Sequence, residues 1–345
     1  MADFKKINKI VWWIPSKKIR NFIREYTASA ELGKDYNQKC RTLIDKTARL
    51  LTVQNDNDIK KRLFKENVYL VEIGISSYCN RKCWFCPNSI VDRRSNNIQL
   101  DEKLFLKVIN ELKEINYSGM INLHRYNEPL YDMDLLRKRI EQINEYIPNS
   151  NVQIFTNGDY LNIEYLELLR NLNVKNIIIS YYYDSVDKNI EFDIDNIIQP
   201  GMDKLLNKLK LEYEILKRSE YEYYIKIKYY NMNIIYKAQN FKYVATPRGE
   251  TITDIKLNKR TMQCFMPVIG IQVDYDGNYT PCCEIRSDIE SHKQYILGNI
   301  QNDTIFDVYT NEKMTDFRKD IFLIGDKKHV CMHCTQGEYN MPGYF

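Results

Sequence analysis

The sequence predicts an α/β protein whose parallel sheet winds into a barrel or an open barrel. From about residue 67 to 255, short apolar runs alternate with stretches of helical spacing, as in βαβ units. Right-handed crossovers between parallel strands curl such a sheet. Past residue 256 this alternation stops, and a hairpin and a helix are expected. We therefore divide the chain into a helical N-terminal extension (1–66), an α/β core (67–255) and a small C-terminal domain (256–345).

Each element is predicted from the period of its apolar residues. The expected strands of the core are 68–75, 120–126, 152–156, 174–181 and 223–230, and its expected helices are 101–115, 133–146, 163–172 and 203–217. In the C-terminal part we expect a hairpin of 268–273 and 279–283 and a helix at 304–317. Because the carboxyl ends of parallel strands meet at one edge, functional groups are expected in the loops that follow the strands.

Composition excludes several classes of protein. The 345 residues carry a net charge of only +4, which gives no indication of nucleic-acid binding. No apolar run reaches the roughly 18–20 residues of a membrane span. The first residues lack the small-residue cleavage site of a signal peptide. We expect a cytoplasmic protein that does not span a membrane.

The N-terminal extension contains a stretch of alternating apolar and basic residues at 10–24. Its spacing predicts a helix packed on the body of the protein, or else a docking or membrane-surface element with a Trp pair and a basic face. This opening is similar to a short stretch near the start of bacterial surface-polysaccharide glycosyltransferases. The resemblance covers about 20 residues of the chain and implies a polysaccharide gene neighbourhood.

Three cysteines, Cys79, Cys83 and Cys86, follow the first predicted strand at the spacing C-x3-C-x2-C. The chain has nine cysteines in total, and in a reducing compartment these are expected to be metal ligands rather than disulfides. A structural zinc site takes four protein ligands. Three thiolates on one loop therefore leave one metal position open, which is what a reactive iron–sulfur cluster needs.

This cysteine loop resembles that of the radical S-adenosylmethionine (SAM) superfamily. The resemblance implies a partial (β/α)6 barrel like that of triosephosphate isomerase, with a [4Fe-4S] cluster held by Cys79, Cys83 and Cys86. It also implies that SAM binds the open iron. Phe85 matches the aromatic position of the family loop, so its expected role is to shield the cluster and to shape the adenine pocket.

Asn127-Glu128-Pro129 follows the second predicted strand and resembles the family's Gly-Gly-Glu-Pro motif, which receives the amino group of SAM. Tyr126 and Asn127 stand where the family has two glycines, whereas Glu128 and Pro129 match. A carboxylate such as that of Glu128 accepts hydrogen bonds from an ammonium group. The simpler interpretation of this segment is a plain strand-to-helix turn.

Thr156-Asn157-Gly158 follows the third predicted strand, where the family resemblance implies a place beside SAM. Ser180 ends the fourth predicted strand and is a candidate to bind the ribose or the carboxylate of SAM. Residues 181–184 come directly after it, and they either face the substrate or simply pack.

Several charged residues lie at or near the ends of predicted strands. Arg125, Lys226, Lys228 and Arg248 are candidates to bind a carboxylate or a phosphate, although most such charges are solvated surface. His124 is an acid–base candidate by residue type, but a lone histidine is more often structural.

A second group of cysteines lies in the C-terminal part: Cys264, Cys282, Cys331 and Cys334. On spacing alone, four such thiols form a closed zinc site. Beside a radical SAM core they instead resemble the SPASM and twitch extensions, which bind auxiliary [4Fe-4S] clusters, and four ligands imply one cluster. Cys283 is left over, either as a small buried apolar residue or as a hydrogen-atom donor. No role is assigned to Cys40.

The resemblance implies an oxidoreductase in which a 5′-deoxyadenosyl radical abstracts hydrogen from an unactivated C–H bond. A substrate radical then either loses an electron and a proton, as in a dehydrogenase, or regains hydrogen from a thiol, as in an epimerase. We expect a carbohydrate- or aminocyclitol-like small molecule as substrate, and flavodoxin or ferredoxin as electron donor. The alternatives are a maturase that modifies a ribosomally made peptide and, more remotely, a zinc-binding protein without catalysis.

Overall fold

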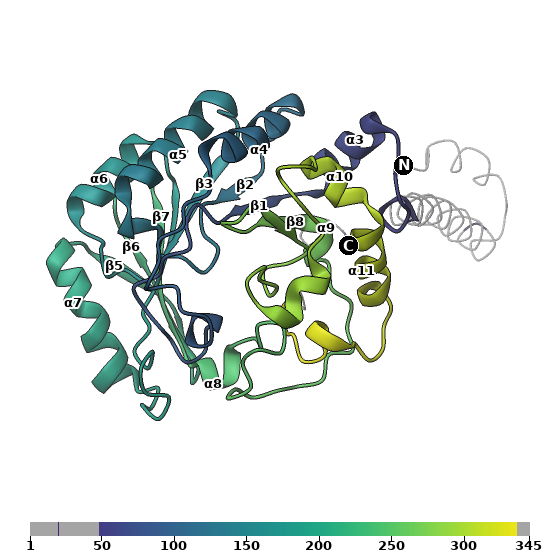
Figure 1. Ribbon diagram of the computed structural model, residues 1–345. Helices are drawn as coiled ribbons and strands as arrows, with labels where there is room; N and C mark the ends of the chain where they lie inside the picture. The colour runs from purple at the N-terminus through teal and green to yellow at the C-terminus, as the bar shows by residue number, and fades with distance from the viewer. Residues whose placement is uncertain (1–19, 21–47, 337–345) are drawn as a thin grey trace. The chain divides into compact units, whose positions relative to one another are not determined.

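The computed structural model describes residue 20 and residues 48–336 (Figure 1). The chain consists of two compact units, Met1–Thr52 and Val53–Phe345, and the fold below is that of the second unit. Apart from Arg20, the predicted helix at 10–24 lies outside the described residues, as does Cys40.

One sheet of ten strands organises the described residues of the second unit. In their order across the sheet, the strands are β10 (Gly298–Asn299), β9 (Asn278–Thr280), β8 (Gly270–Val273), β1 (Leu70–Ile73), β2 (Met120–Asn122), β3 (Asn151–Thr156), β4 (Asn176–Ser180), β7 (Asn233–Gln239), β6 (Glu222–Ile227) and β5 (Tyr213–Arg218). The six neighbouring strands from β8 to β7 are parallel. The predicted α/β class with a parallel sheet is therefore confirmed.

Helices alternate with the strands of the core, and in Figure 1 α4, α5 and α6 lie on the outer face of β2, β3 and β4. The helices of the second unit are α3 (Asn57–Asn67), α4 (Glu102–Glu114), α5 (Met133–Tyr146), α6 (Ile163–Asn171), α7 (Gln199–Leu209), α8 (Phe241–Val244), α9 (Met266–Ile269), α10 (Ile305–Thr310) and α11 (Glu312–Phe322). Shorter helical turns are η1 (Pro87–Ser89), η2 (Pro129–Tyr131), η3 (Ile194–Ile198), η4 (Glu290–Tyr295) and η5 (His329–Cys331).

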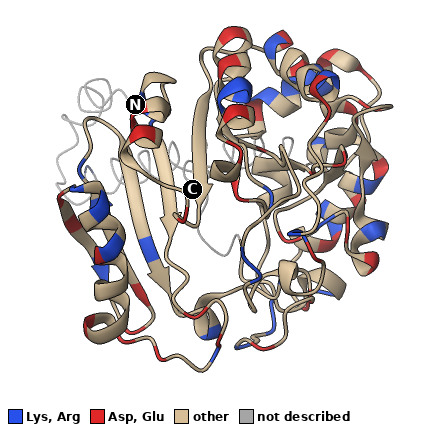
Figure 2. Ribbon diagram, turned by 60° about the vertical axis from the view of Figure 1, so that its left-hand side comes forward, with Lys and Arg blue, Asp and Glu red and all other residues tan. Residues whose placement is uncertain are grey.

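Helix α4 illustrates why the sequence forms these elements. The Asp101 side chain accepts hydrogen bonds from the backbone N–H groups of Lys103 and Leu104, which caps the first turn. Phe105, Val108 and Leu112 recur at helical spacing and are fully buried. Figure 2 shows acidic and basic side chains mixed over the outer helices, while the strands carry few charges. The apolar face of α4 is thus the side of this helix that packs inward.

Two predictions in the second half of the core are wrong in detail. The predicted helix 203–217 ends at Leu209, where Lys210 takes a left-handed conformation with φ of 54°. The chain then forms β5, which pairs antiparallel with β6. Strand β7 was not predicted; it runs parallel to β4 and antiparallel to β6, at the end of the parallel part of the sheet. Strand pairing overrides the helical spacing of the β5 sequence here.

The C-terminal part adds strands to the same sheet. Strand β8 runs parallel to β1 and antiparallel to β9, so the predicted hairpin is confirmed and extends the core sheet. The predicted helix 304–317 is interrupted at Asn311, which caps the second of two helices, α10 and α11. The division of the chain at residue 256 stays a prediction. Within the described part of the chain, no helix is long and apolar enough to cross a membrane.

Candidate active site

A cavity of about 400 Å³ is lined by β1, β2, β3, β4 and β7 and by the loops that follow them. It brings together the residues that the sequence predicted to hold the first cluster, to bind SAM or, in the case of Cys283, to donate a hydrogen atom. The predicted residues in its lining are Cys79, Cys83, Phe85, Cys86, Tyr126, Asn127, Glu128, Thr156, Asn157, Ser180 and Cys283. Their assignment to cofactors stays a prediction.

The cysteine loop is held in place by backbone bonds and by an ion pair. The N–H of Cys86 donates to the carbonyl of Cys83 at 3.0 Å, which closes a tight turn. Arg81 makes a two-point contact with Asp159, with 2.7 Å from Nε to Oδ2 and 2.5 Å from Nη2 to Oδ1. This contact ties the loop to the turn after β3.

Burial raises the pKa of the Cys79 thiol to about 12 and raises the pKa of Cys83 further in the same direction. Thiols in such a place are protonated unless a cation compensates the thiolate charge. Cys86 lines the same cavity. A set of three soft sulfur donors from one loop therefore fits an iron–sulfur cluster.

Glu128 joins the two motifs that were predicted beside SAM. Its Oε1 accepts hydrogen bonds from the Thr156 hydroxyl at 2.6 Å and from the Leu130 N–H at 3.1 Å. Its Oε2 accepts from the Asn157 N–H at 2.8 Å. Burial raises the pKa of Glu128 to about 7, although these hydrogen bonds oppose the shift. The carboxylate thus holds a fixed orientation at the cavity wall.

Tyr126 occupies the backbone conformation that a glycine would favour, with φ of 61°. Such a conformation costs a larger residue on the order of 1 kcal/mol and persists only where surrounding contacts hold it. Asn88 Nδ2 donates to the Tyr126 carbonyl at 2.9 Å, and the Tyr126 hydroxyl donates to the Cys283 carbonyl at 2.6 Å. The guanidinium of Arg286 lies 5.0 Å from the centre of its ring. The turn therefore keeps its shape without the glycine.

An aromatic cluster flanks the cysteine loop. Phe85 is 4% exposed and stacks on Phe241 with ring centres 3.7 Å apart and ring planes 7° from parallel. Tyr182 packs against both rings at 5.2 and 5.6 Å. Phe241 begins α8, which follows a strand that was not predicted. This wall fits the shielding role predicted for Phe85.

Two of the four cations predicted as anion binders line the cavity. Arg125 Nε pairs with Asp274 at 3.1 Å, and Arg248 Nη1 pairs with Glu284 at 3.1 Å. Lys226 and Lys228 are not among the lining residues.

His124 lines the cavity as well. Burial, followed by the charges of nearby arginines, lowers its pKa to about 3. The imidazole is therefore neutral at physiological pH and does not serve there as a cation.

Two lining residues, Lys237 and Gln239, were not predicted, because they belong to the unpredicted strand β7. Lys237 lies in register with Ser180 of β4, and both line the cavity. The alternating burial of Ile234, Tyr236 and Ala238 shows the period-2 pattern that marks this strand. A strand prediction at that place would have brought a lysine to the same edge as Ser180.

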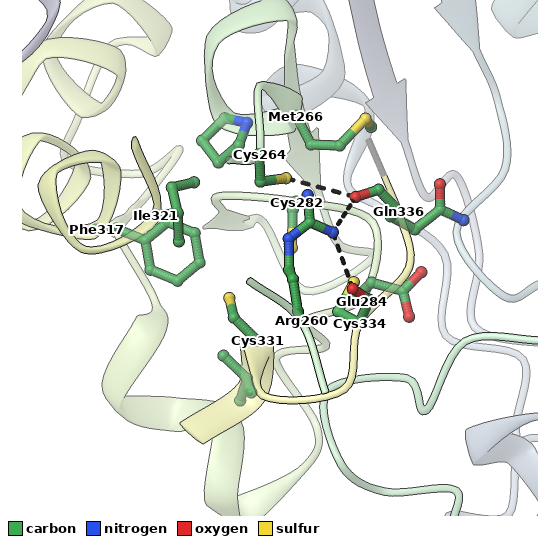
Figure 3. A pocket seen from close by; sticks show the side chains of 12 residues that line it. Arg260, Cys264, Met266, Cys282, Glu284, Phe317, Ile321, Cys331, Cys334 and Gln336 are labelled. Atoms are coloured by element: carbon green, nitrogen blue, oxygen red, sulfur yellow. Dashed lines mark hydrogen bonds between the residues drawn. The ribbon is translucent and has the colours of Figure 1, made fainter. Parts of the chain in front are cut away.

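The four C-terminal cysteines line a second pocket (Figure 3). Burial raises the pKa of all four thiols. Arg260 lies among them, and its Nη1 donates to the carbonyls of Cys334 at 2.8 Å and Gln336 at 2.5 Å. In residues 48–336 no three His, Cys, Asp or Glu side chains are arranged around one point as for a single metal ion. Four sulfur donors around one pocket, three of them buried and that of Cys331 half-buried, fit an iron–sulfur cluster.

Two neighbouring residues face different spaces. Cys282 lines the pocket of the four cysteines, whereas Cys283 lines the cavity of the cysteine loop. Met266 and Gln336 line both. The Sγ of Cys283 donates to Glu284 Oε1 at 3.7 Å. The two spaces therefore share a thin wall, and the Cys282–Cys283 pair is part of it.

The sheet is of the barrel type, and three cysteines share one loop at its edge. Glu128 and Thr156 lie beside that loop, and a second pocket is lined by sulfur. These features define an iron–sulfur protein of the radical SAM type. Two family models match the chain: "Radical SAM superfamily" over residues 73–210 and SPASM, "Iron-sulfur cluster-binding domain", over residues 264–335. The chain belongs to the radical SAM superfamily and carries a C-terminal SPASM region.

Comparison with characterised proteins agrees with this assignment. The S-adenosyl-L-methionine-dependent 2-deoxy-scyllo-inosamine dehydrogenase of Niallia circulans is 27% identical over 270 residues, which cover 77% of this chain and 92% of that enzyme.

Two crystal structures show the same fold. The complex of BtrN with AdoMet and 2-DOIA has a TM-score of 0.57 at 24% identity and covers 81% of this chain and 97% of that one. BtrN in an open conformation has a TM-score of 0.52 at 23% identity, with 79% and 98% covered. The predicted partial-barrel fold is thereby confirmed. The two family models and the Niallia circulans relative in turn identify a radical SAM/SPASM enzyme.

Proposed function

We propose that this enzyme uses a 5′-deoxyadenosyl radical to abstract hydrogen from an unactivated C–H bond of a carbohydrate- or aminocyclitol-type substrate, which it oxidises or epimerises. The observation that carries this proposal is the shared wall at Cys282 and Cys283. It sets a second sulfur-lined pocket directly beside the cavity that holds the SAM motifs. Such an arrangement lets an electron leave or reach the substrate.

Cys79, Cys83 and Cys86 would hold the first [4Fe-4S] cluster, which when bound and reduced supplies the electron that cleaves SAM. The cradle is made by the chain itself. Glu128 has both oxygens fixed by hydrogen bonds and accepts the ammonium of SAM.

The carboxylate of SAM, which is attached to the same carbon as its amino group, also needs partners. Ser180 and Lys237 are neighbours in register on β4 and β7, and they supply a hydroxyl and a cation for that group. Phe85 and Phe241 wall the adenine side against water. Tyr126 and Asn127 complete this turn, in which Asn127 Oδ1 accepts a hydrogen bond from the Arg125 N–H at 2.7 Å.

Cys264, Cys282, Cys331 and Cys334 would hold one auxiliary [4Fe-4S] cluster, which when bound takes up or returns one electron. Arg260 donates to two carbonyls of the same segment as Cys334. It therefore orders the C-terminal cysteine pair against Cys264. These four thiols account for a single cluster.

The substrate radical has two fates within this cavity. Oxidation removes one electron and one proton and leaves a carbonyl. Epimerisation instead takes a hydrogen atom from a thiol on the opposite face, so that a C–H bond forms and an S–H bond breaks. Cys283 is the cavity cysteine left over after three are assigned to the cluster. Its position favours epimerisation as the second candidate function.

The substrate class rests on two supports. The related Niallia circulans enzyme is named for a 2-deoxy-scyllo-inosamine, a polyhydroxylated ring with an amino group. The cavity walls of β1, β2 and β3 are polar, with Glu72, Asn122 and Gln153 in the lining. Rings that carry many hydroxyl groups match such a wall.

The test is an anaerobic assay in deuterated buffer with reductant, SAM and 2-deoxy-scyllo-inosamine as the probe. Formation of 5′-deoxyadenosine together with an oxidised ring identifies a dehydrogenase. A ring inverted at one carbon and carrying deuterium there identifies an epimerase, because thiol hydrogen exchanges with solvent. If the reduced holoenzyme forms no 5′-deoxyadenosine from SAM, the proposed function is wrong.

Cys283→Ala separates the two fates. For an epimerase we expect this variant to form 5′-deoxyadenosine and no inverted product, whereas a dehydrogenase retains product formation. Cys40→Ala is the matched control, since Cys40 belongs to neither cysteine group of the sequence.

A further inference from the structure

A row of polar side chains crosses the parallel sheet. Gln272 of β8, Glu72 of β1, Asn122 of β2 and Gln153 of β3 are partners in the strand register. Residues opposite each other in neighbouring strands project to the same face of a sheet. Glu72, Asn122 and Gln153 line the cavity. None of them was singled out from the sequence.

This row has more hydrogen-bonding capacity than it uses. Glu72 is 9% exposed and Asn122 is 1% exposed. Asn122 Nδ2 donates to Glu72 Oε1 at 3.2 Å. Among the described residues, no hydrogen-bond partner reaches Glu72 Oε2 or Asn122 Oδ1. Buried polar atoms without partners are rare in folded proteins, and two adjacent free acceptors facing a cavity indicate a ligand that donates.

The surrounding charges leave Glu72 as the acid in excess. Arg125 is held by Asp274, by the Thr280 hydroxyl at 3.1 Å and by the Ile285 carbonyl at 2.5 Å. Glu72 Oε2 lies 3.7 Å from Arg125 Nη1 without a hydrogen bond.

The second arginine of this wall is also neutralised, because Arg248 is paired with Glu284. Lys237 lies in register with Ser180 on the far strands of the cavity. The wall around Glu72 therefore offers unpartnered acceptor oxygens and one carboxyl group beyond those that pair the arginines. Burial raises the pKa of the Glu72 carboxyl, so a bound cation would favour its ionised form.

We propose that Glu72 and Asn122 bind the protonated amine of an amino sugar or aminocyclitol. An ammonium group carries three donors and no acceptor, so it fits two adjacent acceptor oxygens and a carboxylate charge. This inference rests on the proposed function, since it names the substrate class for the same cavity. It makes Glu72 and Asn122 the residues that distinguish an amine from a hydroxyl.

The test measures binding without turnover. Holoenzyme with SAM and no reductant is titrated calorimetrically with 2-deoxy-scyllo-inosamine and with the cyclitol in which a hydroxyl replaces the amine. We expect the amine to bind about ten-fold tighter or more, as for a charge-assisted hydrogen bond. Equal binding of the two rings to the wild-type enzyme would overturn the proposal.

Variants test whether Glu72 and Asn122 cause the preference for the amine over the hydroxyl. Glu72→Gln keeps the shape and removes the charge, so the ratio of the two affinities falls toward one. The double variant Glu72→Gln/Asn122→Asp returns one carboxylate to the pair, and the preference for the amine is restored. Glu141→Gln, on an exposed position of α5, leaves the ratio unchanged. A double variant that binds SAM but regains no preference would contradict the assignment.

Turnover separates this inference from the proposed function. If the amine binds selectively but the reduced enzyme forms no 5′-deoxyadenosine, the amine site stands and the radical function fails. If both rings are converted with equal affinity, the radical function stands and the amine site fails.

Discussion

The hydroxyl of Tyr126 donates a hydrogen bond to the backbone carbonyl of Cys283, with 2.6 Å between the two oxygens. Tyr126 belongs to the turn after β2, whereas Cys283 follows β9. This bond therefore joins the turn that carries Glu128 to the wall between the two sulfur-lined spaces. It holds the turn that carries Glu128 at a fixed distance from this wall.

Removing this hydroxyl tests the link. In Tyr126→Phe the Cys283 carbonyl loses its donor in a buried place, so we expect the free energy of unfolding to fall by about 1–2 kcal/mol. Thermal unfolding under anaerobic conditions measures the change. Tyr243→Phe, on a half-exposed ring, is the control. An unchanged unfolding midpoint in Tyr126→Phe would show that the bond contributes nothing.

Glu128 is predicted to be required for SAM binding. In Glu128→Gln one carboxylate oxygen becomes an NH2 group, which meets either the Asn157 N–H or the donors at Oε1. We expect the affinity for SAM to fall about ten-fold or more, because a charged acceptor is lost and two donors face each other. Equilibrium binding of SAM measures it. Glu167→Gln on the exposed side of α6 should bind SAM as the wild type does.

Asp288 is the centre of a largely buried ion cluster that joins the segment after the cysteine loop to the hairpin region. Its Oδ2 accepts from Arg93 Nη2 at 3.0 Å and from Arg286 Nη2 at 2.5 Å. Burial opposes its ionisation, but the hydrogen bond from Arg286 and the charges of both arginines lower the pKa of Asp288 to about 2.

Asp288→Asn leaves two buried guanidinium groups without their acid. We expect a loss of stability of about 3–5 kcal/mol. Asp92→Asn, which alters an exposed pair with Arg94, is expected to leave the unfolding midpoint close to that of the wild type. Comparable unfolding midpoints for the two variants would contradict the role of the cluster.

Glu111 of α4 predicts a pH dependence of stability. Its Oε2 accepts from the Ile305 N–H at 2.8 Å, and burial raises its pKa from 4.5 to about 7. Because the folded state binds the proton more tightly, this group stabilises fully below pH 4.5. That contribution is lost as the pH rises toward about 7.

Glu111→Gln removes the titration. Between the two pKa values we expect the wild type to lose stability relative to the variant, by on the order of 2 kcal/mol. Unfolding midpoints across this range measure the difference. Parallel curves for wild type and variant would show that Glu111 does not titrate in the folded state.

Much of the fold was predictable because local pattern and tertiary structure agree there. The apolar run before Cys79 forms β1, and the helix predicted at 133–146 coincides with α5. The cysteine spacing and the motifs around Glu128 and Thr156 occur in loops after parallel strands, so topology alone brings them to one cavity.

Other features depend on contacts that a sequence pattern does not express. Tyr126 holds a left-handed conformation only because its hydroxyl and carbonyl are bonded to distant residues. Glu72 interrupts an apolar strand, and its partners in the row come from three other strands. Phe241 and Lys237 were missed with β7, whose polar residues obscure its alternation.

The most direct test of this account is the iron content of anaerobically reconstituted protein, measured with its electron paramagnetic resonance spectrum. We predict about eight irons per chain in the wild type, and about four in both Cys79→Ala/Cys83→Ala/Cys86→Ala and Cys264→Ala/Cys282→Ala/Cys331→Ala/Cys334→Ala. The first variant loses SAM cleavage. A colourless wild-type protein that holds zinc alone would contradict the account.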